Sequence, residues 1–178
     1  MPIGSHSCFI RVNLCVLATN PQTILDLGIG YGMNGAGIRN WYSKDVHITG
    51  IEGFEKYRNP MWDLYTEVLI RDIRDFLQYC VAFEEFYDMV IMTDVLEHFT
   101  KEEGIEILKM IAFITKKAAV VSTPAIWFDQ EAVNENELER HHCVWSVDEF
   151  KEQGWGIVQD GSPDYLGHQM IIADKIIR

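Results

Sequence analysis

The most informative part of this 178-residue chain is the glycine-rich segment Asp26-Leu27-Gly28-Ile29-Gly30-Tyr31-Gly32. It continues an apolar run, residues 23–27, that is typical of a buried strand, and it leads into residues 33–42, whose pattern is helical. A glycine-rich turn between a strand and a helix lets the backbone approach a ligand closely. The N–H groups at the start of the helix then face that ligand. The sequence therefore predicts a ligand-binding loop after its first clear strand.

Outward from this loop, β-rich runs alternate with helical patterns. Further strands are expected at 46–52, 68–70, 87–92 and 118–121, and helices at 73–83 and 101–114. Ser146 and Glu149 have the spacing of a capping box, so a short helix should begin there. Residues 156–160 and 169–173 flank a turn at 161–164 and should pair antiparallel. This alternation predicts a single α/β domain, residues 1–178, built on a mostly parallel sheet.

Composition limits the function classes. The chain has 15 basic and 27 acidic residues and a formal net charge of −12. Broad binding to nucleic acid needs a basic surface and is therefore not expected, although a small RNA end in a local pocket is not excluded. No run approaches the ~20 apolar residues of a membrane span, and no basic region precedes an apolar segment at the start of the chain. We expect a cytoplasmic protein without a membrane partner.

Four acidic residues come at the expected carboxyl ends of strands, the edge where open α/β sheets bind ligands. Asp26 precedes the glycines, Glu52 ends the second strand, Asp72 follows the third and Asp94 follows the fourth. An NAD fingerprint would need a third glycine where the chain has Met33, so an NAD site is disfavoured. An acidic rim suits a ligand with an adenine, a ribose and a positively charged tail better than it suits a pyrophosphate.

In these residues the chain resembles the class I S-adenosylmethionine-dependent methyltransferases. The matching motifs are DLGIGYG (26–32), GIE (50–52), RDI (71–73) and YDMVIMTDVLEHF (87–99), and the resemblance runs from about residue 24 to the C-terminus. It implies a Rossmann-like sheet of seven strands, the last antiparallel, with helices on both faces. It also implies S-adenosylmethionine as the cofactor and S-adenosylhomocysteine as the product. The residues expected to contact the cofactor are Asp26, Gly28, Gly30, Glu52, Asp72, Ile73 and Asp94.

Glu97 and His98 follow the fourth strand, beside the expected position of the methyl group. Methyl transfer needs alignment of the acceptor with the methyl group, and a general base that removes a proton from the acceptor assists it. His98 is the expected base, with Glu97 beside it. The alternative is that both residues only cap the next helix.

Because few residues precede the first strand, we expect the later segment, residues 126–145, to cover the substrate as a lid, with Trp127 and Trp145 facing the acceptor.

A metal site is a second interpretation of the same residues. Asp94, Glu97 and His98 have i, i+3, i+4 spacing, which places three ligands on one face of a helical turn, and His141 or His142 would complete the set. This pattern is similar to that of two metal-using groups, the small-RNA 3′-end 2′-O-methyltransferases and the ubiquinone-pathway O-methyltransferases. Asp94 stands where their pattern has Glu, and we favour the metal-free interpretation.

The sequence thus predicts a methyltransferase that acts on a small polar acceptor through oxygen or nitrogen. Two alternatives stay open. One is a metal-dependent RNA-end 2′-O-methyltransferase, and the other is a non-catalytic module that binds S-adenosylmethionine.

Overall fold

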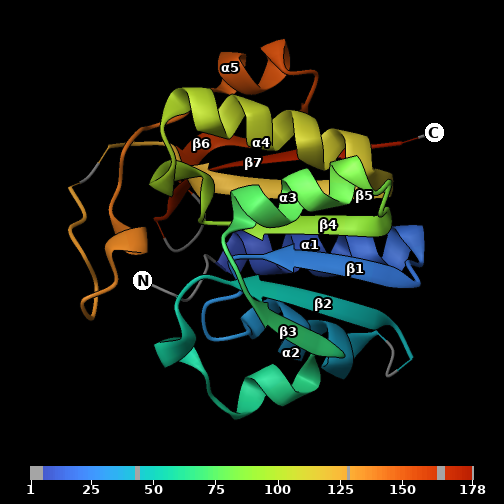
Figure 1. Cartoon of the computed structure of the whole chain (residues 1–178). Helices are drawn as coiled ribbons and strands as arrows, with labels where there is room; N and C mark the ends of the chain where they lie inside the picture. The colour runs from blue at the N-terminus through green and yellow to red at the C-terminus, as the bar shows by residue number, and fades with distance from the viewer. Residues whose placement is uncertain (1–5, 43–44, 128, 164–166, 178) are drawn as a thin grey trace.

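A computed structural model describes residues 6–42, 45–127, 129–163 and 167–177. In it a single sheet has helices on both faces (Figure 1). Its strands, within the described residues, are β1 (Thr23–Leu27), β2 (His47–Glu52), β3 (Glu67–Ile70), β4 (Tyr87–Thr93), β5 (Thr115–Pro124), β6 (Gly156–Pro163) and β7 (Gln169–Ile176). They lie in the order β3-β2-β1-β4-β5-β7-β6.

Strands β1 to β5 are mutually parallel, and β7 runs antiparallel to both β5 and β6. The predicted seven-stranded α/β sheet with an antiparallel last strand is therefore confirmed. β5 is longer than the expected 118–121. The turn between β6 and β7 includes residues 164–166, which lie outside the described residues.

The core has two layers, one on each face of the sheet. Helices α1 (His6–Thr19) and α2 (Met33–Trp41) cover one face, and α3 (Ile73–Ala82), α4 (Lys101–Ile114) and α5 (Val147–Glu152) cover the other (Figure 1). Central strand residues such as Leu25 and Val90 are fully buried. Burying one such side chain stabilises the fold by about 1.5–3 kcal/mol, so the apolar middle of the sheet holds the strand ends in fixed positions.

Side-chain caps begin three of these helices. Asp72 accepts a hydrogen bond from the backbone of Arg74 and caps α3. Thr100 and Glu103 form a capping box at α4, and Ser146 and Glu149 form the predicted one at α5. Such a cap contributes about 1 kcal/mol. Because α4 begins at Lys101, residues 96–98 are not its caps but a separate 3₁₀ turn, η3 (Leu96–His98).

Helix α1 was not predicted by the sequence reasoning. Cys8, Val12, Cys15 and Val16 pack into the core below it, while Leu14 and Leu17 are more than half exposed. The helix is apolar nearly all round, so it lacks a clear amphipathic period. Within the described residues, no helix has the length and apolar character needed to cross a membrane.

Candidate functional site

One cavity of about 640 Å³ runs along the edge where the parallel strands end. The loop between β1 and α2, the ends of β2 and β4, the start of α3 and a later segment all contribute to its wall. We call residues 129–145 the lid segment. Figure 1 shows this segment, in orange, beside the end of the sheet where β1 terminates. Six of the seven predicted cofactor residues line the cavity: Gly28, Gly30, Glu52, Asp72, Ile73 and Asp94.

The glycine loop is pressed against the end of β4. The backbone N–H of Gly28 donates to the carbonyl of Ile51 at 2.8 Å. Gly28 has a φ of +72°, and a Cβ atom there would lie 2.5 Å from Cγ2 of Val95. Both the left-handed backbone and the close approach require glycine. The sequence thus places a bare backbone surface at this part of the cavity.

Glu52 is held rigidly at the end of β2. Its two carboxylate oxygens accept hydrogen bonds from the backbone N–H groups of Gly30 and Phe54, each at 2.9 Å. The side chain is 6% exposed. Burial raises the pKa of the Glu52 carboxyl, and these two backbone donors oppose the rise. A carboxylate oxygen accepts more than one hydrogen bond, so Glu52 can also accept from a ligand hydroxyl.

Asp26 lies behind this wall and is not among the residues that line the cavity. It is 1% exposed, and its carboxylate accepts a hydrogen bond from the phenol of Tyr65 at 2.6 Å and from the amide of Asn34 at 3.4 Å. Burial raises its pKa to about 6, against the effect of these two donors. A contact between Asp26 and the cofactor stays a prediction.

Asp72 and Ile73 lie at the start of α3. The carboxylate of Asp72 forms hydrogen bonds with both the backbone and the guanidinium of Arg74, at 2.6–3.0 Å. These bonds hold the pKa of Asp72 below its usual value. Arg74 also reaches Glu103 at 2.5 Å. A contact between Asp72 and the cofactor stays a prediction.

Asp94 follows β4 and has a φ of +56°. Its Oδ1 accepts a hydrogen bond from the hydroxyl of Ser122 at 2.8 Å. Left-handed backbone at a residue other than glycine is uncommon and is associated with functional sites. This bond links Asp94 to the end of β5 rather than to Glu97 and His98.

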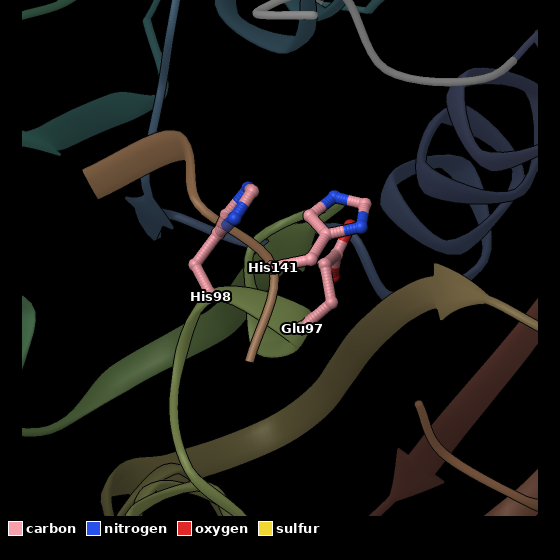
Figure 2. Close-up of side chains that lie close together, drawn as sticks. All are labelled: Glu97, His98 and His141. Carbon is pink, nitrogen blue, oxygen red and sulfur yellow. The ribbon is translucent and has the colours of Figure 1, made fainter. Parts of the chain in front are cut away.

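Glu97, His98 and His141 form a cluster from two separate segments, η3 and the lid segment (Figure 2). Their nearest ligand-type atoms all lie within 4.8 Å of one another. The rings of His98 and His141 have centroids 5.1 Å apart. Asp94 is not part of this cluster, so the alternative metal set that joined Asp94 to Glu97 and His98 is not found among the described residues. Of the two candidate lid histidines, His141 joins it.

His98 lines the cavity, whereas Glu97 and His141 are not among its lining residues. Nδ1 of His98 is 3.2 Å from the carbonyl oxygen of Arg140. Since a carbonyl only accepts, this bond places the proton on Nδ1 and leaves Nε2 as an acceptor. Burial lowers the pKa of His98 to about 4. The imidazole is therefore neutral near pH 7.

Glu97 is 3% exposed, and its Oε2 has no hydrogen-bond partner among the described residues. Burial, followed by the charge of Asp94, raises its pKa well above the usual value. An unpartnered buried carboxyl oxygen is costly. Glu97 is therefore suited to hold a proton or a cation.

The lid segment is anchored at both ends of the cavity. The backbone N–H groups of His142 and Cys143 donate to the carbonyl of Glu97, at 2.9 and 3.3 Å. The phenol of Tyr57 donates to Glu139 at 2.9 Å. Five residues of the segment line the cavity: Asn136, Glu137, Leu138, Glu139 and His142. Its role as a substrate lid stays a prediction.

Two expectations about the acceptor side are corrected. Cys8 and Phe9 of α1 line the cavity, so the later segment does not cover it alone. Trp145 is 2% exposed and packs in the core against Gly104, away from the cavity. Trp127 is half exposed and donates to Asp129, and it is not among the lining residues.

Sequence reasoning missed several residues that shape the site. Tyr57 ends one 3₁₀ turn and Tyr65 follows another, and neither belongs to a motif. Val95 lies within the motif at 87–99, but the motif does not indicate its contact with Gly28. Their positions depend on contacts between distant parts of the chain. A buried carboxylate such as Asp26 implies a hydrogen-bond donor nearby, but the sequence alone does not say which residue donates.

No protein-family model matches the chain, and no curated protein does so at a significant level. Solved structures do match. An O-methyltransferase family protein from Burkholderia thailandensis has 13% identity and a TM-score of 0.66 over 97% of this chain. This chain spans 56% of that protein.

Two further structures match over nearly the whole chain. Magnesium protoporphyrin IX methyltransferase from Synechocystis PCC 6803, solved with bound S-adenosylmethionine, has 16% identity and a TM-score of 0.65, over 97% of this chain and 78% of that protein. A S-adenosylmethionine-dependent methyltransferase from Archaeoglobus fulgidus has 15% identity and a TM-score of 0.60, over 94% of each chain. The chain therefore has the class I methyltransferase fold that the sequence resemblance implied.

Proposed function

We propose that this chain is a methyltransferase that transfers the methyl group of S-adenosylmethionine to a small polar acceptor, at oxygen or nitrogen. The observation that carries the proposal is that one cavity joins the bare glycine loop, the held carboxylate of Glu52 and His98. These groups meet at the carboxyl edge of the sheet, where this class of fold binds its ligands. The fold supports the proposal, because the Synechocystis neighbour was solved with the same cofactor.

In this proposal each part of the cavity binds one part of the cofactor. Gly28 and Gly30 let the amino-acid tail approach the backbone. Glu52 accepts hydrogen bonds from the ribose hydroxyls, while Asp72 and Ile73 contact the adenine. Asp94 contacts the cofactor near the methyl-bearing end. Asp26 acts on the tail from behind the glycine loop.

His98 is the proposed general base. Its Nε2 is available as an acceptor because Nδ1 donates to the Arg140 carbonyl, and a neutral imidazole can take the proton of an acceptor hydroxyl or amine. Glu97 does not line the cavity. Its contribution would therefore pass through the cluster with His98 and His141 rather than through contact with the acceptor.

A metal-assisted transfer is the second candidate, and the cluster in Figure 2 is the specific observation that favours it. Glu97, His98 and His141 offer one oxygen and two nitrogen ligands, and the unpartnered Oε2 of Glu97 is an acceptor that a cation would satisfy. This donor set suits borderline divalent ions such as Zn²⁺, Mn²⁺ or Fe²⁺. A bound ion would supply Lewis acidity to an acceptor oxygen. An RNA end as the acceptor rests on the sequence resemblance alone.

Calorimetry with S-adenosylhomocysteine and with NAD tests the cofactor. We expect a micromolar dissociation constant for S-adenosylhomocysteine, about −8 kcal/mol, and no heat with NAD. Binding of NAD without a response to S-adenosylhomocysteine would refute the proposal. A screen of acceptor compounds with labelled S-adenosylmethionine then separates an enzyme from a module that only binds the cofactor.

Treatment with a chelator separates the two catalytic candidates. If His98 is a base without metal, chelator leaves the rate unchanged. If the cluster holds a metal, chelator abolishes transfer, a divalent ion restores it, and His141→Ala reproduces the loss.

A further inference from the structure

The lid segment forms part of the wall opposite Glu52. Within it, η4 (Glu137–Glu139) is a 3₁₀ turn whose last residue contacts the last residue of η1 (Glu55–Tyr57). Glu139 is 9% exposed and accepts a hydrogen bond from the phenol of Tyr57 at 2.9 Å. The amide of Asn136 lies 3.4 Å from the same phenol oxygen. A Cβ at Gly53 would lie 2.5 Å from Cδ1 of Leu138. The turn thus closes against the residues that follow Glu52.

The lid segment also reaches the part of the cavity that His98 lines. His141 is two residues beyond Glu139, and the carbonyl of the residue between them, Arg140, accepts the bond from His98. Gln130 ties this stretch together, since its amide donates to the carbonyl of Glu139 at 2.7 Å and its own carbonyl accepts from the N–H of His141 at 3.1 Å. Glu139 and His141 therefore cannot shift far independently of each other.

We propose that the lid segment supplies a second carboxylate, Glu139, to the ribose subsite, and that a bound ribose thereby holds His141 against His98. Tyr57 and Glu139 are then positioning residues, and cofactor binding completes the acceptor side of the cavity. The inference rests on the proposed function, because it assumes that the ligand beside Glu52 is the ribose of S-adenosylmethionine.

The physical reason is charge. Glu52 and Glu139 both line the cavity, and the charge of Glu139 adds to the rise in the pKa of Glu52. Two carboxylates that line the same cavity repel each other, and this repulsion opposes the closed position of the lid segment. A ribose donates two hydroxyl groups, and hydroxyl donors between the carboxylates remove that repulsion. A ligand shifts a conformational equilibrium only through contacts that differ between the two states, and these hydroxyls make such contacts only when the lid is closed.

Hydrogen exchange measures the closure directly. Peptides that cover residues 129–145 are followed in the full chain, alone and with saturating S-adenosylhomocysteine, 5′-methylthioadenosine or L-methionine. The first two carry the ribose, and the third does not. We expect S-adenosylhomocysteine and 5′-methylthioadenosine to slow exchange in the lid segment at least five-fold, and L-methionine to leave it unchanged.

Variants assign the effect to the Tyr57–Glu139 contact. Tyr57→Phe removes the phenol that orients Glu139, and Glu139→Gln removes the charge but keeps an acceptor for Tyr57. The matched control is Tyr87→Phe, because the phenol of Tyr87 donates to Glu85 at 2.7 Å outside the cavity. We expect both test variants to lose most of the protection that S-adenosylhomocysteine gives the lid. Tyr87→Phe should keep it, even if its melting temperature falls as far.

The outcomes separate this inference from the proposed function. If S-adenosylhomocysteine does not bind in calorimetry, the proposed function fails. If it binds but leaves the exchange of residues 129–145 unchanged, the inference fails and the proposed function stands. Equal protection in wild type and in both test variants would also overturn the inference, because the closure would then not depend on Glu139.

Discussion

The two walls of the cavity are held by different kinds of contact. On the side of β1 and β2, backbone groups fix the site: Gly28 donates to Ile51, and Glu52 accepts from the backbone of Gly30. On the lid side, much of the position depends on side chains from distant segments, such as Tyr57 with Glu139. The first wall is built into the sheet and should exist without ligand. The second wall is an irregular segment, and its position depends on side-chain contacts such as the one between Tyr57 and Glu139.

This contrast suggests that changes in the first wall act on cofactor affinity, and that changes near the lid act on the rate of transfer. Two substitutions, His98→Ala and Glu52→Gln, test this division. A third, Asp26→Asn, tests the buried carboxylate behind the first wall.

His98→Ala should have the largest effect. If His98 is the general base, the loss in kcat is on the order of 10²–10⁴, with little change in the affinity for S-adenosylhomocysteine. Because burial lowers the pKa of His98 to about 4, the wild-type rate should fall as pH drops through that region, and the variant should lack this limb. His47→Ala, at an exposed histidine paired with Glu67 on the sheet, is the control. A rate that survives both His98→Ala and a chelator would leave alignment alone as the mechanism.

Glu52→Gln should weaken cofactor binding without a selective loss of rate in the bound state. Hydrogen bonds to a charged group contribute about 1.5–3 kcal/mol, so the dissociation constant for S-adenosylhomocysteine should rise at least ten-fold. The melting temperature should fall as well, because an amide cannot accept both the Gly30 and the Phe54 N–H groups through two oxygens. Glu67→Gln, at a half-exposed glutamate of β3, is the control. An unchanged dissociation constant would place the ribose elsewhere.

The first wall was largely predictable from the sequence, and the second was not. Gly28, Gly30 and Glu52 are set by strand ends, where a local pattern of apolar runs, glycines and acids fixes the position of each residue. The cluster of Glu97, His98 and His141 could not be predicted, because His141 reaches the other two residues through a long irregular segment. The path of such a segment leaves no periodic pattern in the sequence. The i, i+3, i+4 spacing failed for Asp94 because residues 96–98 form a 3₁₀ turn and Asp94 takes a left-handed backbone that directs it to Ser122. Helix α1 also exposes apolar side chains such as Leu14 and Leu17, so its sequence has no clear amphipathic period. Its contribution to the cavity wall could therefore not be predicted from the sequence.

Asp26→Asn should have the smallest effect on methyl transfer, and its main effect is on the pH dependence of stability. Because burial raises the pKa of Asp26 from 3.8 to about 6, its neutral form stabilises the fold. That contribution is complete below pH 3.8 and is lost as pH rises through about 6. The difference in melting temperature between Asp26→Asn and wild type should therefore shift in favour of the variant across this window. The rise in pKa from 3.8 to about 6 corresponds to about 3 kcal/mol. At about 2–4 °C per kcal/mol for a chain of this length, the two melting temperatures should move by roughly 6–12 °C relative to each other. A difference that does not vary between pH 4 and 6 would mean that Asp26 is ionised throughout.

In the proposed function, S-adenosylmethionine lies across this edge of the sheet with its methyl group at His98. Nuclear Overhauser contacts from the ¹³C-labelled methyl group of bound S-adenosylmethionine measure this directly in a protein of 20.6 kDa. We expect contacts from the methyl group to the ring protons of His98, and their absence in His98→Ala while binding persists. Bound cofactor whose methyl group contacts other residues, with no signal to His98, would contradict this placement.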